Sequence, residues 1–199
     1  VTTGLSYLKE NPQKETFYEF GGLVNYGIAE NKPRFSGFYT QLFNRINNSK
    51  LQITGGSTVH QFGEDYPIKK LINSLSSSWF GKNYAKFYQK DFVRYQYEIE
   101  LINGIFTKAD LEYANRIPLF TSNNPKDPTD FVNPGFEQNQ IVKLKLSATI
   151  NFDQKYILYP NRKQNIYSSK YPVLQLNYEK GMASSISKYN YDLIGASVK

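Results

Sequence analysis

Residues 93–101 read VRYQYEIEL, and residues 105–113, beyond Asn103-Gly104, read IFTKADLEY. Apolar residues take most odd positions of both stretches, and polar or charged residues take most even positions. A period of two is the spacing of side chains on one face of a β-strand. The two stretches therefore predict an antiparallel hairpin with one apolar face and one charged face.

The length of the connecting loop follows from the need to keep both faces intact. A two-residue turn would place apolar positions of one strand opposite polar positions of the other. A three-residue loop, Ile102–Gly104, with a left-handed Gly104 in a bulge, corrects this mismatch. Glu98 then lies opposite Lys108, and Arg94 lies opposite Glu112. We expect these four residues to form ion pairs in the lumen of a barrel.

The same alternation recurs along the chain, and no linker divides it, so we predict one all-β domain or barrel fragment over residues 1–199. A turn at Glu30–Pro33 sets Phe35 and Tyr39 beside the apolar face of the strand before it. Residues 155–159 are expected to extend the preceding strand, and the rest of the connection over residues 153–170 is expected to form a plug-like or periplasmic excursion. The predicted strands are Thr16–Ile28, Arg34–Asn44, Leu51–His60, the hairpin, Gln140–Phe152, Tyr171–Gly181 and one that begins near Tyr191.

Two long connections, residues 61–91 and 117–139, fall at the same end of this sheet, because antiparallel strands alternate in direction. In the first of them, Ile68, Leu71, Ile72 and Leu75 have helical spacing and predict a short amphipathic helix. The connections at the opposite end are mostly short. Long external loops and short periplasmic turns are typical of outer-membrane barrels.

Composition limits the alternatives. The chain has 17 Tyr and 14 Phe but no Cys and one His, so disulfides and thiolate metal sites are excluded. The net charge is +7, but the Lys and Arg residues are interspersed with Asp and Glu and form no basic run. This argues against nucleic-acid binding. No stretch approaches the ~20 apolar residues of a membrane helix, and no signal peptide is recognised. Strands that face lipid on one side need only alternate apolar residues.

The cleanest strand, residues 140–152, presents Val142, Leu144, Leu146 and Ile150 on one side and lysines on the other. We expect those four side chains to face lipid. The predicted strands are long enough to cross a bilayer obliquely, and aromatic residues gather at their ends. The alternative is a soluble β-barrel or β-sandwich that encloses the apolar face and binds a hydrophobic ligand or carbohydrate.

The sequence points to no enzyme, cofactor or metal. His60 has no His or acidic partner at metal-ligand spacing, and Glu98, Glu100, Asp110 and Glu112 have basic residues in register, which favours ion pairs over paired catalytic carboxylates. Aromatic residues in the first long connection predict a loop contact surface: Trp79, Phe80, Tyr84 and Tyr88.

Four short motifs carry a family resemblance: residues 83–88 (NYAKFY), 100–104 (ELING), 116–119 (RIPL) and 171–181 (YPVLQLNYEKG). The chain resembles an uncharacterised family of large Bacteroidota outer-membrane proteins over roughly residues 15–195. In that family a carboxypeptidase-regulatory-like domain precedes a barrel of the surface-antigen, Omp85-like group. The resemblance implies a barrel wall that further strands complete, and it implies no catalytic residues.

Together these observations predict an antiparallel transmembrane β-barrel, or a large part of one, with long external loops and a short helix. We expect it to lie in the cell outer membrane with a structural, scaffold or translocation-related role. Its expected partners are outer-membrane lipid and other envelope protein subunits.

Overall fold

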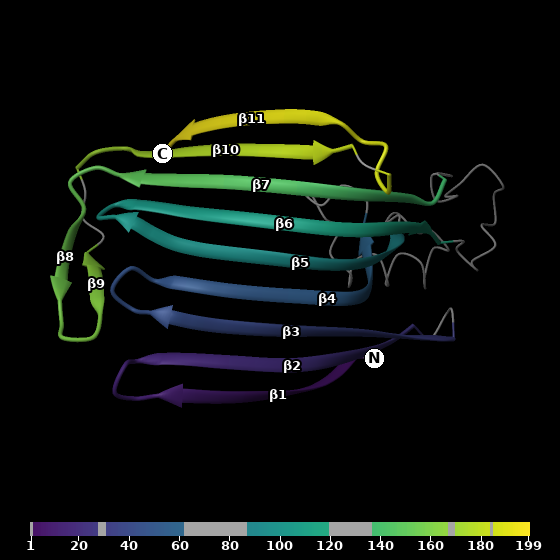
Figure 1. The fold of residues 1–199 in the computed structure, drawn as a ribbon, viewed down its shortest axis with the longest axis horizontal. Coiled ribbons are helices and arrows are strands. Elements are labelled where there is room, and N and C mark those ends of the chain that lie inside the picture. Colours follow the sequence, from purple (N-terminus) through teal and green to yellow (C-terminus); the bar gives the residue numbers. More distant parts are fainter. Residues whose placement is uncertain (1, 28–30, 62–86, 120–136, 167–169, 184) are drawn as a thin grey trace, which may run out of the picture.

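The protein is built around one nine-stranded antiparallel sheet (Figure 1). This computed structural model describes residues 2–27, 31–61, 87–119, 137–166, 170–183 and 185–199. Sequential strands are neighbours throughout, in the order β1-β2-β3-β4-β5-β6-β7-β10-β11. The strands are β1 Thr2–Asn11, β2 Thr16–Gly27, β3 Lys32–Asn44, β4 Ser49–Gln61, β5 Phe87–Ile102, β6 Ile105–Pro118, β7 Asn139–Asn151, β10 Val173–Met182 and β11 Tyr191–Val198.

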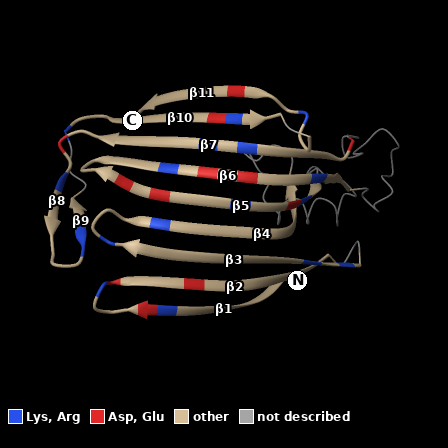
Figure 2. Cartoon of the chain, viewed as in Figure 1, with Lys and Arg blue, Asp and Glu red and all other residues tan. Residues whose placement is uncertain are grey.

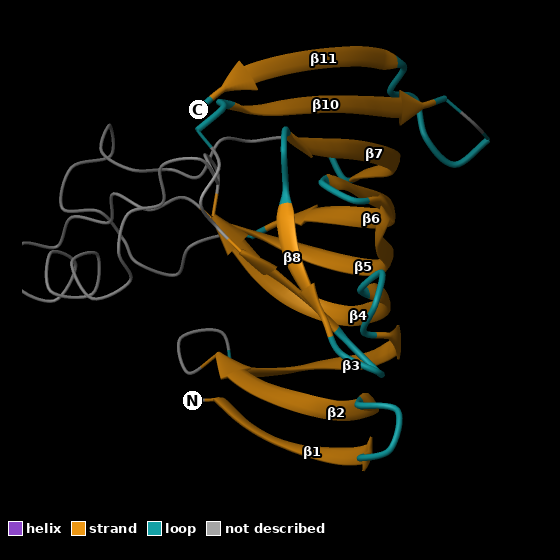
Figure 3. Ribbon diagram, turned by 90° about the vertical axis from the view of Figure 1, so that its left-hand side faces the viewer, coloured by secondary structure: helices purple, strands orange, loops and turns teal. Residues whose placement is uncertain are grey.

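The all-β, antiparallel prediction is confirmed, but barrel closure is not. Within the described residues the sheet is open, with β1 and β11 as its two edges. It is strongly twisted, as the view from its short-turn end shows (Figure 3). The predicted helix over Ile68–Leu75 lies outside the described residues. The residues that the structure describes contain no helix.

The hairpin of β5 and β6 has the predicted register. Glu98 pairs with Lys108 and Arg94 pairs with Glu112, and a bulge lies between Glu100 and Ile102. Gly104 has φ of +83°, so it adopts the left-handed conformation that the bulged loop requires. A Cβ atom at this position would lie 2.4 Å from the Asn151 carbonyl oxygen, because β7 passes close to the turn.

This register extends across the sheet, because directly paired residues of antiparallel strands project to the same face. One row of paired residues crosses seven strands and defines the apolar face: Tyr7, Phe20, Tyr39, Ile53, Tyr95, Leu111 and Leu144. The alternate positions define the polar face, which carries Lys50, Lys90, Arg94, Glu98, Lys108, Asp110, Glu112, Lys143, Lys145 and Glu179.

The turn predicted at Glu30–Pro33 is wrong, because pairing of β2 with β3 continues to Gly27 and Lys32. Phe35 and Tyr39 nevertheless share the apolar face of β2, as expected. Pro33 is tolerated within β3 because β3 and β4 pair only as far as Ser36 and Gly56. Pro33 therefore has no β4 partner that needs its missing N–H.

The connection from β7 to β10 contains a separate two-stranded sheet, formed by β8 (Lys155–Leu158) and β9 (Lys163–Ile166). Residues 155–159 therefore do not extend β7. The short hairpin crosses the end of the main sheet that carries the turns after β1, β3 and β5 (Figures 1 and 3). The predicted extension of β7 is wrong, because residues 155–158 pair with β9 in a sheet of their own.

We expect Gly104→Ala to destabilise the fold. The left-handed conformation costs a non-glycine residue about 1–3 kcal/mol, and the added methyl group would contact the β7 backbone. Urea unfolding followed by circular dichroism measures the change. Gly195→Ala is the control, since nothing lies within 4 Å of its Cβ position. Equal stability of both variants would contradict this account of the turn.

Candidate functional site

The apolar face is exposed across the sheet. Tyr95 is 49% exposed, Leu146 42% and Ile194 80%. Four described hydrophobic residues are buried, and none of the large side chains in the described part is fully buried. An exposed apolar surface of this extent indicates a surface that contacts something other than water.

The length of the apolar face can be measured along β5. On β5 its apolar run extends from Val93 to Leu101, beyond Asp91 at the long-loop side. At ~3.4 Å per residue the run is about 27 Å long. A strand tilt of ~40° reduces this to about 20 Å, near the ~25 Å band of membrane barrels. On β10 and β11 the band ends at an ion pair between Lys180 and Asp192, with a separation of 2.7 Å.

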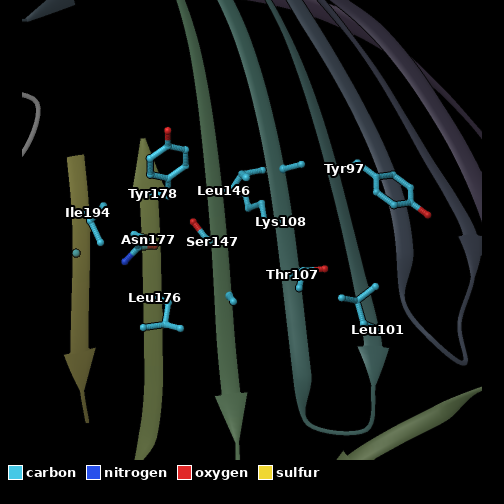
Figure 4. Close-up of a pocket in the computed structure, with 13 residues that line it drawn as sticks. Tyr97, Leu101, Thr107, Lys108, Leu146, Ser147, Leu176, Asn177, Tyr178 and Ile194 are labelled. Atoms are coloured by element: carbon cyan, nitrogen blue, oxygen red, sulfur yellow. The ribbon is translucent and has the colours of Figure 1, made fainter. Parts of the chain in front are cut away.

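A groove of about 550 Å³ lies on this face where small residues lower the surface (Figure 4). Ala109 and Ala148 form part of its lining, and Leu146, Leu176 and Ile194 surround it. The groove crosses strands from β5 to β11, so it belongs to the sheet as a whole and not to one hairpin. It offers apolar contact but few polar groups to orient a ligand.

The polar face carries a network of ion pairs that spans β4, β5, β6, β7 and β10. Figure 2 shows acidic and basic positions side by side on these strands. Glu98 binds two lysines, one from each neighbouring strand. The pairs are Lys50–Glu98 at 2.9 Å, Lys108–Glu98 at 3.1 Å, Lys90–Glu112 at 2.8 Å, Arg94–Asp110, Lys145–Glu179 at 2.8 Å and Lys143–Glu179 at 3.9 Å.

The structure changes one predicted pairing. Arg94 lies opposite Glu112 in register, but its guanidinium donates to both oxygens of Asp110. Glu112 instead accepts from Lys90, and the side chains of this pair are only 7% and 9% exposed. Long side chains reach diagonal neighbours on a strand pair, so register alone does not fix the partner.

The remaining predicted site residues divide by location. Val142, Leu144, Leu146 and Ile150 all lie on the apolar face, since they pair with Tyr113, Leu111, Ala109 and Ile105 of β6. Trp79, Phe80 and Tyr84 lie outside the described residues. Tyr88 lies within β5 rather than in a loop; it is 6% exposed, and its ring stacks on His60.

Sequence reasoning missed the contact between the β8–β9 hairpin and the polar face. Lys163 of β9 binds Glu100 of β5 at 2.5 Å, and the Glu100 side chain is 1% exposed. Asn165 also donates to Glu100, and Gly104 N–H donates to the same carboxylate. The sequence signal was the length of the connection over residues 153–170, which is longer than the other turns at its end of the sheet.

The described part of the chain offers neither a metal-ligand cluster nor a membrane-spanning helix. It contains no group of three His, Cys, Asp or Glu residues placed to hold a metal ion. It also contains no helix that is long and apolar enough to cross a bilayer.

The fold defines an all-β domain, built mainly on one large antiparallel sheet with an exposed apolar side and an ion-paired polar side. The chain belongs to the family described as "Family of unknown function (DUF5686) C-terminal domain", which matches residues 1–199. The expected membership of an uncharacterised family is thereby confirmed. Neither the curated proteins nor the solved structures gave a match.

We predict that Glu112→Gln destabilises the protein by roughly 3 kcal/mol, because it leaves the buried Lys90 charge without a carboxylate. The double variant Lys90→Met/Glu112→Gln recovers at least half of that loss. Chemical unfolding in detergent gives the free energies of unfolding of Glu112→Gln, of Lys90→Met and of the double variant.

Lys180→Met is the control for this experiment, since it removes the more exposed pair with Asp192 and should leave the free energy of unfolding nearly unchanged. The Lys90–Glu112 account is wrong if the double variant loses the sum of its two single losses.

Proposed function

We propose that this domain forms wall strands of a β-barrel in the outer membrane, with the apolar face against lipid and the polar face toward the lumen. Its role is structural, as a scaffold or in translocation, and not enzymatic. The observation that carries this proposal is an apolar row across seven strands, exposed or half-buried along its length, with ion-paired side chains on the opposite face.

Charge burial supports this assignment of the faces. Lys90 and Glu112 are almost fully covered on the polar side, whereas Tyr95 and Leu146 are exposed on the other. A water-soluble protein normally reverses this arrangement. A membrane reconciles both observations, because lipid solvates the apolar side chains and a narrow lumen lets charges neutralise one another.

The soluble alternative, a barrel or sandwich that binds a hydrophobic ligand or carbohydrate, requires the apolar face to be enclosed. The β8–β9 hairpin lies against Glu100, which places it on the polar side of the sheet. Within the described residues, the hairpin therefore covers one end of the charged side and none of the apolar side, and this favours the membrane orientation.

Closing the wall needs partner strands. β1 and β11 both run from the long-loop end to the short-turn end, so pairing them directly would produce a parallel pair (Figure 1). Bacterial outer-membrane barrels are antiparallel with even strand numbers. An odd number of further strands, added to these nine, would satisfy that rule. We propose that polypeptide outside residues 1–199 supplies these strands.

The finer family resemblance agrees with this picture. Membership in the surface-antigen, Omp85-like group of Bacteroidota outer-membrane proteins would assign such a barrel to the cell envelope. Partner subunits and surface ligands would then meet the connections at the long-loop end.

Spin labels at adjacent positions of β7 test the proposal. Leu146 and the Lys145 side chain have similar exposure, 42% and 45%, but project to opposite faces. In bilayers we expect oxygen, which concentrates in lipid, to reach a label at Leu146 more than one at Lys145. A water-soluble nickel chelate should show the opposite preference.

Labels at Val142, Leu144 and Ile150 should show the same accessibility to oxygen as the label at Leu146. A label at Lys143 should show the same accessibility to the chelate as the label at Lys145. The membrane proposal fails if the chelate reaches the even and odd positions equally, or if the even positions are inaccessible to both reagents.

A further inference from the structure

The β8–β9 hairpin reaches across the short-turn end of the whole sheet. It leaves β7 and returns to β10, and between them it contacts the turns that follow β1, β3 and β5. Asn161 donates to the Gln13 carbonyl oxygen at 2.7 Å, and Arg162 lies 3.6 Å from Glu15. The Lys163 N–H donates to the carbonyl oxygen of Arg45. We call residues 155–166 the strap.

One buried ion pair fastens the strap to the polar face. Lys163 and Glu100 are 9% and 1% exposed, and they lie 2.5 Å apart. Lys163 also approaches Asn103 at 3.5 Å, and Asn103 donates to the Gln154 carbonyl oxygen at 2.6 Å. The base of the strap is therefore tied to the β5–β6 turn by charge and hydrogen bonds.

Apolar packing contributes little to this attachment. Ile157, Leu158 and Ile166 of the strap remain 45%, 61% and 39% exposed. Segments with few buried apolar contacts open locally at low free-energy cost. When the strap lifts as a unit, water solvates both Lys163 and Glu100, which offsets the loss of their mutual attraction.

A half-open pocket of about 260 Å³ lies beside the point of attachment. Glu98, Glu100 and Lys108 line it together with the apolar side chains of Ile99 and Phe106. Because Glu100 both lines this pocket and binds Lys163, lifting the strap would widen access to the polar face at the short-turn end.

We propose that the strap is a displaceable gate over the short-turn mouth of the lumen, with the Lys163–Glu100 ion pair as its lock. This inference rests on the proposed membrane function, because a lumen exists only if the polar face is enclosed. The solutes that this gate would admit are small and hydrophilic, since Glu98, Lys108 and their neighbours line the path with both negative and positive charges.

The test uses full-length protein in the outer membrane of its own cells, with influx of a membrane-impermeant dye as the measurement. Lys163→Met removes the lock and should raise influx at least about tenfold. In this background we add Gln13→Cys and Asn161→Cys, and a cleavable bis-maleimide joins the strap to the β1–β2 turn. The chain has no natural Cys, so the linkage is specific to these positions within it.

Cross-linking should return influx to the wild-type level, and cleavage of the linker should restore the high influx. A control pair, Asn11→Cys with Thr16→Cys, cross-links register partners of β1 and β2 and should leave influx high. Lys145→Met removes a different lysine of the polar face and should not raise influx.

Two results would overturn the gate. One is an unchanged influx in Lys163→Met at wild-type membrane abundance, and the other is a high influx that the Gln13–Asn161 cross-link fails to suppress. Either would leave the strap as a fixed brace and the barrel proposal intact. Absence of the protein from the membrane fraction would instead overturn the proposed function and the gate with it.

Discussion

The structure depends on a register that never exchanges the two faces of the sheet. In an antiparallel sheet each side chain shares its face with the residues directly across both neighbouring strands, so a slip by one position would move a whole strand's apolar side chains to the charged side. The row from Tyr7 to Leu144 passes through six strand pairings without such a slip. Extra residues occur between Leu42 and Asn44 and between Glu100 and Ile102, and in both places they lie beside a turn, so the faces stay intact along the rest of each strand.

This constraint determines where charge can be buried. Because the apolar row holds one side, every lysine and carboxylate in the middle of β5, β6 and β7 projects to the other, where its nearest neighbours are ions of opposite sign. Buried ion pairs contribute little net stability compared with apolar packing, yet they are costly to break singly. Pairs such as Lys90–Glu112 therefore specify the strand order and register more than they add to the free energy of unfolding.

The extent to which the sequence predicts this structure follows from the same physics. The β5–β6 hairpin was predictable in register, because period-two alternation and Asn103-Gly104 act over a few residues. The partner of Arg94 was not, since a long side chain chooses among diagonal neighbours that differ by small distances. β1 was missed because Leu8, directly after Tyr7, interrupts the alternation that Leu5 and Tyr7 begin. β8 and β9 were missed because four-residue strands carry too few positions for a period to be seen.

The strap explains why the connection after β7 departs from the short turns at its end of the sheet. In the proposed barrel, a wall with a charged inner side would leave an opening at its end unless something covered it, and turns of two to four residues are too short to do so. Residues 155–166 have the necessary length, and their contacts with Gln13, Arg45 and Glu100 come from three separate turns or strands. Because these contacts are polar, they can be exchanged for water without exposing a core. A purely structural brace would gain more from burying Ile157 and Leu158, which instead remain exposed. The composition of the strap thus favours reversible attachment over permanent packing.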